Sequence, residues 1–220
     1  MLSLRLKTIE SMVDPGKVVA DIGTDHALLP VELVKSGKVD KVYAVDNKSG
    51  PYLRAMQYIK EQGCQDKITA ILADGLTAVS DDADCWVIAG MGYDTAALIL
   101  SQPTSIRQGQ QLIVQVNHGV ERMRRYLCDH GWQITDERII FEAHYYQIIK
   151  AAKMKSVIRL KNEDISFGPI LRNEKSPIFV QYWESEAEKL QRIVERLDRK
   201  NKRAQELQKQ ISSIVNMLNG

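Results

Sequence analysis

Short apolar runs alternate with helical stretches through the first 130 residues of the chain. The apolar runs suit buried strands and cover residues 18–22, 42–45, 68–72, 85–89 and 112–116. The predicted helices cover residues 3–13, 26–36, 50–62, 94–101 and 119–130. Because parallel strands need a crossover connection, this alternation predicts a doubly wound α/β fold, with a mostly parallel sheet covered by helices on both faces.

Two further β-rich stretches follow, at residues 133–141 and 145–151, and only Glu142-Ala143-His144 separates them. No helix fits in three residues, so the two stretches should form an antiparallel hairpin at one edge of the sheet. Five parallel strands that end in an antiparallel pair favour the Rossmann-like methyltransferase variant of this fold over a dehydrogenase half-domain.

The composition changes near residue 153 and divides the chain into two predicted domains, 1–160 and 161–220. Phe167-Gly168-Pro169 interrupts regular structure, and Ser176-Pro177 begins a charged helical region that continues to Asn219. Its apolar residues recur in sevens, which predicts an α-helical coiled coil. The two heptad series are Leu190, Leu197, Ala204, Ile211 and Leu218, and Ile193, Leu207 and Ile214, with Lys200 interrupting the second. Periodicity leaves two alternatives: one long helix, or two antiparallel helices with a turn at Lys200-Asn201-Lys202.

Composition excludes several classes of protein. With 30 Lys+Arg against 28 Asp+Glu, the net charge of +2 is too small for a polycation that binds nucleic acid by bulk charge. No apolar run reaches the roughly 18–20 residues of a membrane span, and the N-terminus lacks a signal-peptide pattern. The three cysteines form no C-x-x-C pair and the four histidines are widely spaced, so we expect no disulfide framework and no metal site. We expect a soluble, cytoplasmic protein.

Acidic residues, amides and glycines follow every predicted parallel strand, at the edge where ligands bind in such sheets. An acid at Asp46, shortly after the second strand, is placed to hold the two ribose hydroxyls of an adenosine. An acid at Asp74 can accept from the adenine amino group. The predicted cofactor contacts are Asp21, Gly23, Thr24, Asp25, His26, Asp46, Asn47, Asp74, Gly75, Leu76, Ala89, Gly90 and Met91.

The turn after the first strand is unsuited to a dinucleotide. Only Gly23 of a G-x-G-x-x-G pattern is present, and Asp25 stands where the second glycine would be. A carboxylate there would repel a diphosphate but suits S-adenosylmethionine, which carries an ammonium and a sulfonium group. Asp25 is also the candidate catalytic residue, because it could favour the positive charge that moves onto the group accepting the methyl. The alternative is that Asp25 only caps the following helix.

Several stretches resemble the bacterial tRNA (adenine-22-N1)-methyltransferase family across essentially the whole chain. They are residues 19–30 (VADIGTDHALLP), 50–52 (GPY), 73–76 (ADGL), 88–92 (IAGMG) and 167–171 (FGPIL), with Ser176-Pro177 and the helical tail. The resemblance implies a class I, S-adenosylmethionine-dependent enzyme that methylates N1 of a tRNA adenine. It also implies a C-terminal coiled coil, usually a helical hairpin, that helps to bind tRNA. The chain departs from the family pattern at Tyr93, where a glycine is typical, and at Val116, where a proline is common.

We expect the adenine to leave its stack before reaction, flanked by Tyr93 or Met91, and the RNA to lie on local basic surface. The predicted substrate contacts are Gly92, Tyr93, Asn117, His118, Arg122, Arg125, Lys153 and Lys155, with Arg124, residues 150–161 and the basic residues of the tail as further candidates. We expect a monomer, with dimerisation through the coiled coil as the alternative. Two other functions stay open from the residues alone: methylation of a small molecule, and RNA binding without catalysis.

Overall fold

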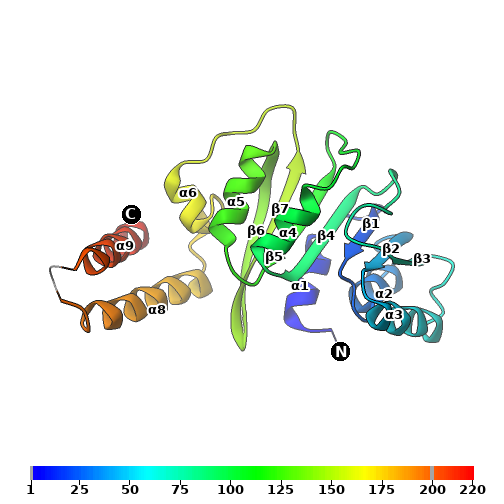
Figure 1. Ribbon diagram of the computed structural model, residues 1–220, viewed down its shortest axis with the longest axis horizontal. Coiled ribbons are helices and arrows are strands. Elements are labelled where there is room, and N and C mark those ends of the chain that lie inside the picture. Colours follow the sequence, from blue (N-terminus) through cyan, green and yellow to red (C-terminus); the bar gives the residue numbers. More distant parts are fainter. Residues whose placement is uncertain (1, 199–200) are drawn as a thin grey trace.

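The computed structural model describes residues 2–198 and 201–220. Within these residues, seven strands form one sheet in the order β3-β2-β1-β4-β5-β7-β6 (Figure 1). The first five strands are parallel, and β7 runs antiparallel to both β5 and β6. The strands are β1 (Val18–Ile22), β2 (Lys41–Asp46), β3 (Ile68–Leu72), β4 (Cys85–Met91), β5 (Gln111–Val116), β6 (Trp132–Glu142) and β7 (His144–Lys153). The predicted doubly wound sheet with an antiparallel edge hairpin is confirmed.

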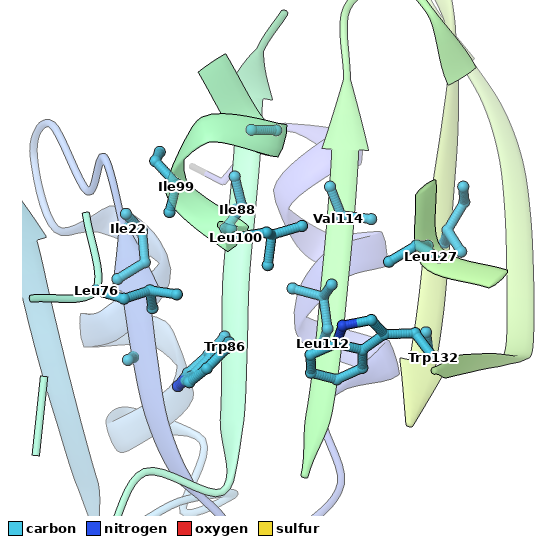
Figure 2. Close-up of a cluster of buried hydrophobic side chains, with 14 of the residues drawn as sticks. Ile22, Leu76, Trp86, Ile88, Ile99, Leu100, Leu112, Val114, Leu127 and Trp132 are labelled. Atoms are coloured by element: carbon cyan, nitrogen blue, oxygen red, sulfur yellow. The ribbon is translucent and has the colours of Figure 1, made fainter. Parts of the chain in front are cut away.

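Helices cover both faces of this sheet. One apolar cluster joins the sheet to α1 (Leu4–Met12), α2 (Leu28–Lys35) and α3 (Ser49–Glu61). A second cluster joins the opposite face to α4 (Tyr93–Leu100) and α5 (Val120–Asp129). Figure 2 shows this second cluster, in which Ile88 and Val114 of the central strands meet Leu100 of α4 and Leu127 of α5. Trp86 and Trp132 extend it, with ring centroids 6.1 Å apart.

The C-terminal region contains α6 (Asn162–Phe167), α7 (Leu171–Glu174), α8 (Pro177–Val194) and α9 (Lys202–Asn219). The short helices α6 and α7 were not predicted. Figure 1 shows α8 and α9 side by side beyond the β6 edge, at the opposite end of the molecule from α2 and α3. The chain therefore reverses between them, and the interpretation as one long helix is wrong. Of the predicted turn, Asn201 caps α9 by accepting from the Arg203 amide, whereas Lys200 lies outside the described residues.

The reversal breaks the predicted heptad register on α8. Val194 is buried, whereas the predicted contact residue Ile193 is 41% exposed. Phe179 of α8 and Ile214 of α9 are buried with Ile139 of β6 in one apolar cluster. The helical pair thus packs partly against itself and partly against the edge hairpin of the sheet.

A buried ion pair joins the sheet domain to the segment that leads into the C-terminal helices. Arg124 of α5 and Glu137 of β6 are fully buried, and their Nε and Oε1 atoms lie 2.7 Å apart. The Arg124 guanidinium also donates to the carbonyls of Ile165 and Ser166, at 3.2 and 3.3 Å. Arg124 therefore holds the fold together, and its prediction as an RNA contact is wrong.

The same ion pair explains the glycine of the F-G-P sequence. Gly168 has φ +90°, and a Cβ atom there would lie 2.7 Å from Glu137 Oε2 and 2.8 Å from Arg124 Nη2. Just beyond it, the Ile170 amide donates to Glu137 Oε2 at 3.0 Å. Because a side chain at Gly168 would displace the ion pair, the close approach of this segment requires glycine.

Candidate functional site

A cavity of about 580 Å³ opens at the carboxyl ends of β1, β2 and β3. This first cavity lies at the edge of the sheet where the sequence predicted a ligand. Its lining contains seven of the predicted cofactor contacts, which are Gly23, Asp25, Asp46, Asn47, Asp74, Gly75 and Met91. It also contains apolar groups that were not predicted, including Pro51, Leu98 and Ile99. The volume and the mixture of apolar walls with a few polar groups are typical of a small-molecule site.

The loop after β1 shapes the cavity through an unusual backbone. Gly23, Asp25 and Ala27 all have positive φ, at 77°, 51° and 54°. The amides of Gly23 and Thr24 both donate to the Val45 carbonyl, at 2.8 and 3.0 Å, which fastens the loop to β2. A Cβ atom on Gly23 would collide with the terminal methyl of Met91. The positive φ favours glycine at position 23, where the ends of β1 and β4 approach.

Two acids at successive strand ends face this cavity. Asp46 is 8% exposed, and its carboxylate accepts from the amides of Asp25 at 3.2 Å and Lys48 at 3.0 Å. Asp74 lies on the next strand end, where its Oδ1 is 3.3 Å from Asn47 Nδ2. Gln102, after α4, holds this turn by accepting from the Leu76 amide at 2.7 Å. A carboxylate has about four acceptor positions, so both acids keep capacity for ligand hydroxyl or amino groups.

A second, smaller cavity of about 170 Å³ lies beside the first, and Gly23 and Asp25 line both. Asp21 stands in its wall and is 7% exposed. Burial raises the pKa of Asp21 to about 6, against the opposing effect of the Thr24 hydroxyl, and the charge of Asp46 adds to the increase. The other predicted residues in this wall are Thr24, His26 and Ala89.

Arg5 of α1 lines the second cavity together with this buried acid, and it was not among the predicted site residues. Its amide and that of Leu4 donate to the Glu142 carboxylate, at 3.2 and 2.7 Å, so the edge hairpin anchors the start of α1. Nothing in the local pattern around Arg5 separates it from a cation on an ordinary amphipathic helix. Arg5 gives the second cavity a cation, and Asp21 and Asp25 give it carboxylates, so groups of both charges are present for the carboxylate and ammonium of an amino acid.

Asp25 is more exposed than expected for a cofactor contact and is paired with a cation of the protein. Its carboxylate is 60% exposed, accepts from Arg54 Nη2 of α3 at 2.9 Å and lies 3.6 Å from His26 Nε2. The N-cap residue of α2 is Ala27, and no side chain caps that helix. The alternative that Asp25 serves as a helix cap is therefore wrong. Because Arg54 already balances its charge, the buried acid Asp21 is the better partner for a ligand cation.

The ends of β4 and β5 meet beside these cavities. The sheet register shifts between Ala89 and Met91, and Gly90 between them has φ +78°. A third cavity of about 490 Å³ lies on this side, lined by Arg5, Gly90, Asn117, His144, Tyr145 and Tyr146. Consecutive residues of β4 thus face three cavities, because Ala89 lines the second, Gly90 the third and Met91 the first.

The other predicted substrate contacts near this point pack closely together. A Cβ atom on Gly92 would lie 2.6 Å from His118 Cε1, and one on Gly119 would lie 2.8 Å from Tyr93 Cβ. The Arg122 guanidinium lies over the Tyr93 ring, 4.0 Å from its centroid, and bonds to Asp94 at 2.9 Å. Tyr93 therefore supports a surface cation and is absent from the lining of the three cavities.

Three predicted substrate contacts lie apart from this site. Arg125 is exposed on α5. Lys153 pairs with Trp132, the first residue of β6, and its ammonium contacts the His130 carbonyl. Its neighbour Ala152 pairs with Gln111, the first residue of β5, and Lys155 follows in the chain. Since β7 is antiparallel to β5, its last residues lie roughly 20 Å from the carboxyl edge of the sheet, at about 3.3 Å per residue. The structure therefore brings Lys153 and Lys155 to the opposite edge from the cavities.

Two findings concern other kinds of site. In the described residues, no cluster of three or more His, Cys, Asp or Glu side chains is arranged to hold a metal ion. None of the helices described here combines the length and apolar character needed to cross a bilayer.

Comparison with known proteins agrees with this geometry. A Bacillus subtilis (strain 168) tRNA (adenine(22)-N(1))-methyltransferase is 31% identical over 203 residues, covering 89% of this chain and 85% of the relative. Streptococcus pneumoniae Sp1610, solved with S-adenosyl-L-methionine, is 36% identical, covers 99% of this chain and 100% of its own, and superposes with a TM-score of 0.86. M. capricolum TrmK, solved with S-adenosyl-homocysteine, is 30% identical, covers 100% and 98%, and has a TM-score of 0.89. The model of the tRNA (adenine(22)-N(1))-methyltransferase family matches residues 19–217, and this chain belongs to that family.

Proposed function

We propose that this protein transfers a methyl group from S-adenosylmethionine to N1 of adenine 22 in tRNA. The observation that carries the proposal is the pair of adjoining cavities. They offer acids to an adenosine at the ends of β2 and β3, and groups of both charges to an amino acid beside β1. Relatives of similar fold were solved with S-adenosylmethionine and with its demethylated product.

The residues fit each part of this cofactor. Asp46 would accept from the two ribose hydroxyls, and Asp74 from the adenine amino group. Leu98 and Pro51 would cover the adenine faces. Asp21 would hold the ammonium and Arg5 the carboxylate of the methionine portion. Gly75 and Leu76 would form the turn next to the adenine, and Gln102 fixes this turn.

When bound, S-adenosylmethionine supplies a methyl group on a positively charged sulfur. Adenine N1 is unprotonated near neutral pH, so the protein needs no strong general base to free the lone pair. Alignment of the two ligands can then lower the barrier by up to about 7–11 kcal/mol. Gly90 and Met91 lie where the cavities meet and would place the methyl and the base in line. Asp25 lies between the first two cavities, and its proposed role is to favour positive charge there.

Methyl transfer to tRNA transcripts tests the proposal directly. Purified protein with labelled cofactor should methylate a transcript that has adenine at position 22 and leave a transcript with A22→G unmodified. Mass spectrometry of the digested RNA should locate the group on N1 of that adenine. Transfer to small molecules but not to tRNA would establish the small-molecule alternative. Cofactor binding without transfer to either would favour the RNA-binding alternative.

The C-terminal helices would extend the RNA-binding surface. We propose residues 1–160 as the catalytic domain and 161–220 as a helical domain whose α8 and α9 form an antiparallel coiled coil. Several apolar residues of these helices, including Phe179 and Ile214, pack within one chain, which supports a monomer. A tRNA substrate also supports a cytoplasmic location.

Three cations of α9, Lys202, Arg203 and Lys209, are exposed and have no ion-pair partner among the described residues. Replacing all three with alanine should weaken tRNA binding and reduce the slope of log K against log salt by up to about 2–3, since each phosphate contact contributes about 0.9. Fluorescence anisotropy with labelled tRNA at several salt concentrations measures both quantities.

The control removes the same charge from the opposite end of the molecule, with alanine at Lys35, Lys60 and Lys67. Its salt slope should equal that of the unmodified protein. Equal slopes for the two triple variants would mean that α9 makes no phosphate contacts and that net charge alone governs binding.

A further inference from the structure

The third cavity has the size and lining of a site for one nucleotide. Its volume of about 490 Å³ lies within the usual range for small ligands. The wall formed by β7 contributes His144, Tyr145 and Tyr146, which are flat rings of the kind on which unpaired bases stack. The same lining contains Gly90 and Asn117, at the ends of β4 and β5, and the Arg5 guanidinium, which lies 5.5 Å from the centroid of the Tyr146 ring. A purine needs aromatic rings for stacking and polar groups for recognition of its edge.

A buried amide beside Gly90 and Asn117 fixes these polar groups. Gln115 of β5 is 1% exposed, and its Oε1 accepts from the Gly90 amide at 3.0 Å and from Arg5 Nη1 at 2.9 Å. Its Nε2 donates to Asn117 Oδ1 at 3.1 Å, and Asn117 Nδ2 donates to the Gly90 carbonyl at 2.8 Å. Arg5 and the Gly90 amide have only hydrogens to offer, so Gln115 must turn its oxygen toward them. The orientation of Asn117 then follows from that of Gln115.

Asn117 and Gly90 therefore offer the cavity hydrogen-bond acceptors with free lone pairs. Asn117 Oδ1 and the Gly90 carbonyl oxygen each receive one hydrogen bond from the protein, and each oxygen has a second lone pair. Both residues are exposed to the cavity that they line. An amino group would satisfy these acceptors, whereas the carbonyl that guanine carries at the equivalent position would meet them with repulsion.

We infer that the third cavity holds the target adenine with its 6-amino group donating to Asn117 Oδ1 and the Gly90 carbonyl, and that Gln115 is the positioning residue that keeps these acceptors turned toward the base. This inference rests on the proposed function. As the N1–carbon bond forms, the carbon–sulfur bond breaks, its electron pair stays on sulfur, and the positive charge moves to the adenine ring. The amino group shares that charge, so its hydrogen bonds to the two oxygens strengthen during the reaction.

The test compares two tRNAs that differ only at the target nucleotide, which carries adenosine in one and purine riboside, without the amino group, in the other. For the unmodified protein, kcat/KM should be higher on the adenosine tRNA. Asn117→Ala should lower kcat/KM on the adenosine tRNA by about tenfold or more, the usual effect of losing one or two such bonds, and change the purine riboside reaction much less. An equal loss on both tRNAs would overturn the inference, because Asn117 would then not contact the amino group.

Gln115→Glu tests the positioning role with an isosteric side chain. A carboxylate still accepts from Arg5 and the Gly90 amide but cannot donate to Asn117, so the Asn117 amide loses its fixed orientation. We expect reduced preference for the adenosine tRNA, measured as the ratio of kcat/KM on the two tRNAs, which does not depend on how much of the enzyme is folded. The new carboxylate beside Arg5 should also weaken S-adenosylhomocysteine binding. Retention of the full preference would contradict the role of Gln115. Gln57→Ala, on the exposed surface of α3, is the control and should leave the preference intact.

Failure of the proposed function gives a different result. If the protein does not methylate tRNA, the unmodified chain is inactive on both transcripts. If only the inference fails, the unmodified chain is active and the Asn117 and Gln115 variants keep its preference for the amino group.

Discussion

Replacing Arg124 with methionine should lower the free energy of unfolding by about 3–5 kcal/mol, because it leaves the buried carboxylate of Glu137 without its cation. Glu137→Gln should cost a similar amount for the converse reason. A double variant with Arg124→Met and Glu137→Leu should be destabilised less than the sum of the losses in the Arg124→Met and Glu137→Leu single variants. The difference, the coupling energy, should be about 2–3 kcal/mol. Urea unfolding followed by far-UV circular dichroism measures these differences.

The expected damage is concentrated in the segment between the sheet and the C-terminal helices. Arg124 donates to the carbonyls of Ile165 and Ser166, while Glu137 accepts from the amides of Ile170 and Leu171. Limited proteolysis of the Arg124→Met variant should therefore cut near these residues first. A loss of less than about 1 kcal/mol, within the range of a surface pair, would show that the ion pair does not hold this segment.

Gly168→Ala tests the same contact from the other side. Its cost should exceed that of Gly109→Ala, since both glycines have positive φ, at 90° and 82°, but only a side chain at Gly168 meets the ion pair. Positive φ adds backbone strain of about 1–3 kcal/mol to each variant, and Gly168→Ala adds the contact with the ion pair. Equal costs would mean that the segment moves aside without disturbing Arg124.

The sequence predicted the sheet well because its parallel strands read as short apolar runs, and β1, β2, β4 and β5 are largely buried. The two predicted strands 18–22 and 68–72 match β1 and β3 residue for residue. The start of α2 was placed two residues early, at His26. Asp25 and Ala27 adopt left-handed conformations, so the helix begins only at Leu28, and the sequence did not predict these conformations.

The errors at single residues have identifiable causes. Arg124 lies on the apolar stripe of α5 with Val120, Met123 and Leu127, so its spacing already indicated burial. A charged residue at such a position needs a partner from elsewhere in the chain, and Glu137 is 13 residues away. Lys153 was assigned to the site because residues 150–161 are basic, without regard to the direction of β7.

The missed site residues come from parts of the chain where local pattern carries no information about function. Arg5 reaches the cavities only because α1 packs against the edge hairpin, a contact between residues 137 positions apart. Gln115 stands within the buried strand β5, where a single amide in an apolar run predicts a polar partner but not its identity. Residues at strand ends, in contrast, were predicted because topology alone brings them together.

Asp21→Asn should weaken S-adenosylhomocysteine binding at pH 7 by at least about 30-fold, since removing one partner of a buried, hydrogen-bonded charge pair costs about 2–5 kcal/mol. The unmodified protein should also lose affinity as the pH falls through 6. Burial raises the pKa of the free Asp21 carboxyl to about 6, and the ligand ammonium requires the ionised form. Each pH unit below 6 should then cost about tenfold in affinity, until the pKa of Asp21 in the complex is reached. Isothermal titration calorimetry between pH 5 and 7 measures this dependence.

The groups around Asp21 do not remove the effect. Asp46 adds negative charge that supports the raised pKa, while Arg5 and His26 line the same cavity. Asp21→Asn should show much less pH dependence over this range, and Asp40→Asn, on the exposed surface, should behave like the unmodified protein. A pH dependence of binding that persists in Asp21→Asn would contradict the assignment of this titration to Asp21.

The stability of the ligand-free protein should change in the opposite direction. A carboxyl whose pKa is higher in the folded state than in the unfolded state favours folding when protonated, so its ionisation destabilises the free protein as the pH rises from about 4 to 6. Asp21→Asn should therefore be more stable than the unmodified chain at pH 7, with the difference shrinking toward pH 4. Greater stability together with weaker ligand binding in Asp21→Asn would show that Asp21 serves ligand binding. If Asp21 had only a structural role, its replacement would lower both stability and ligand binding.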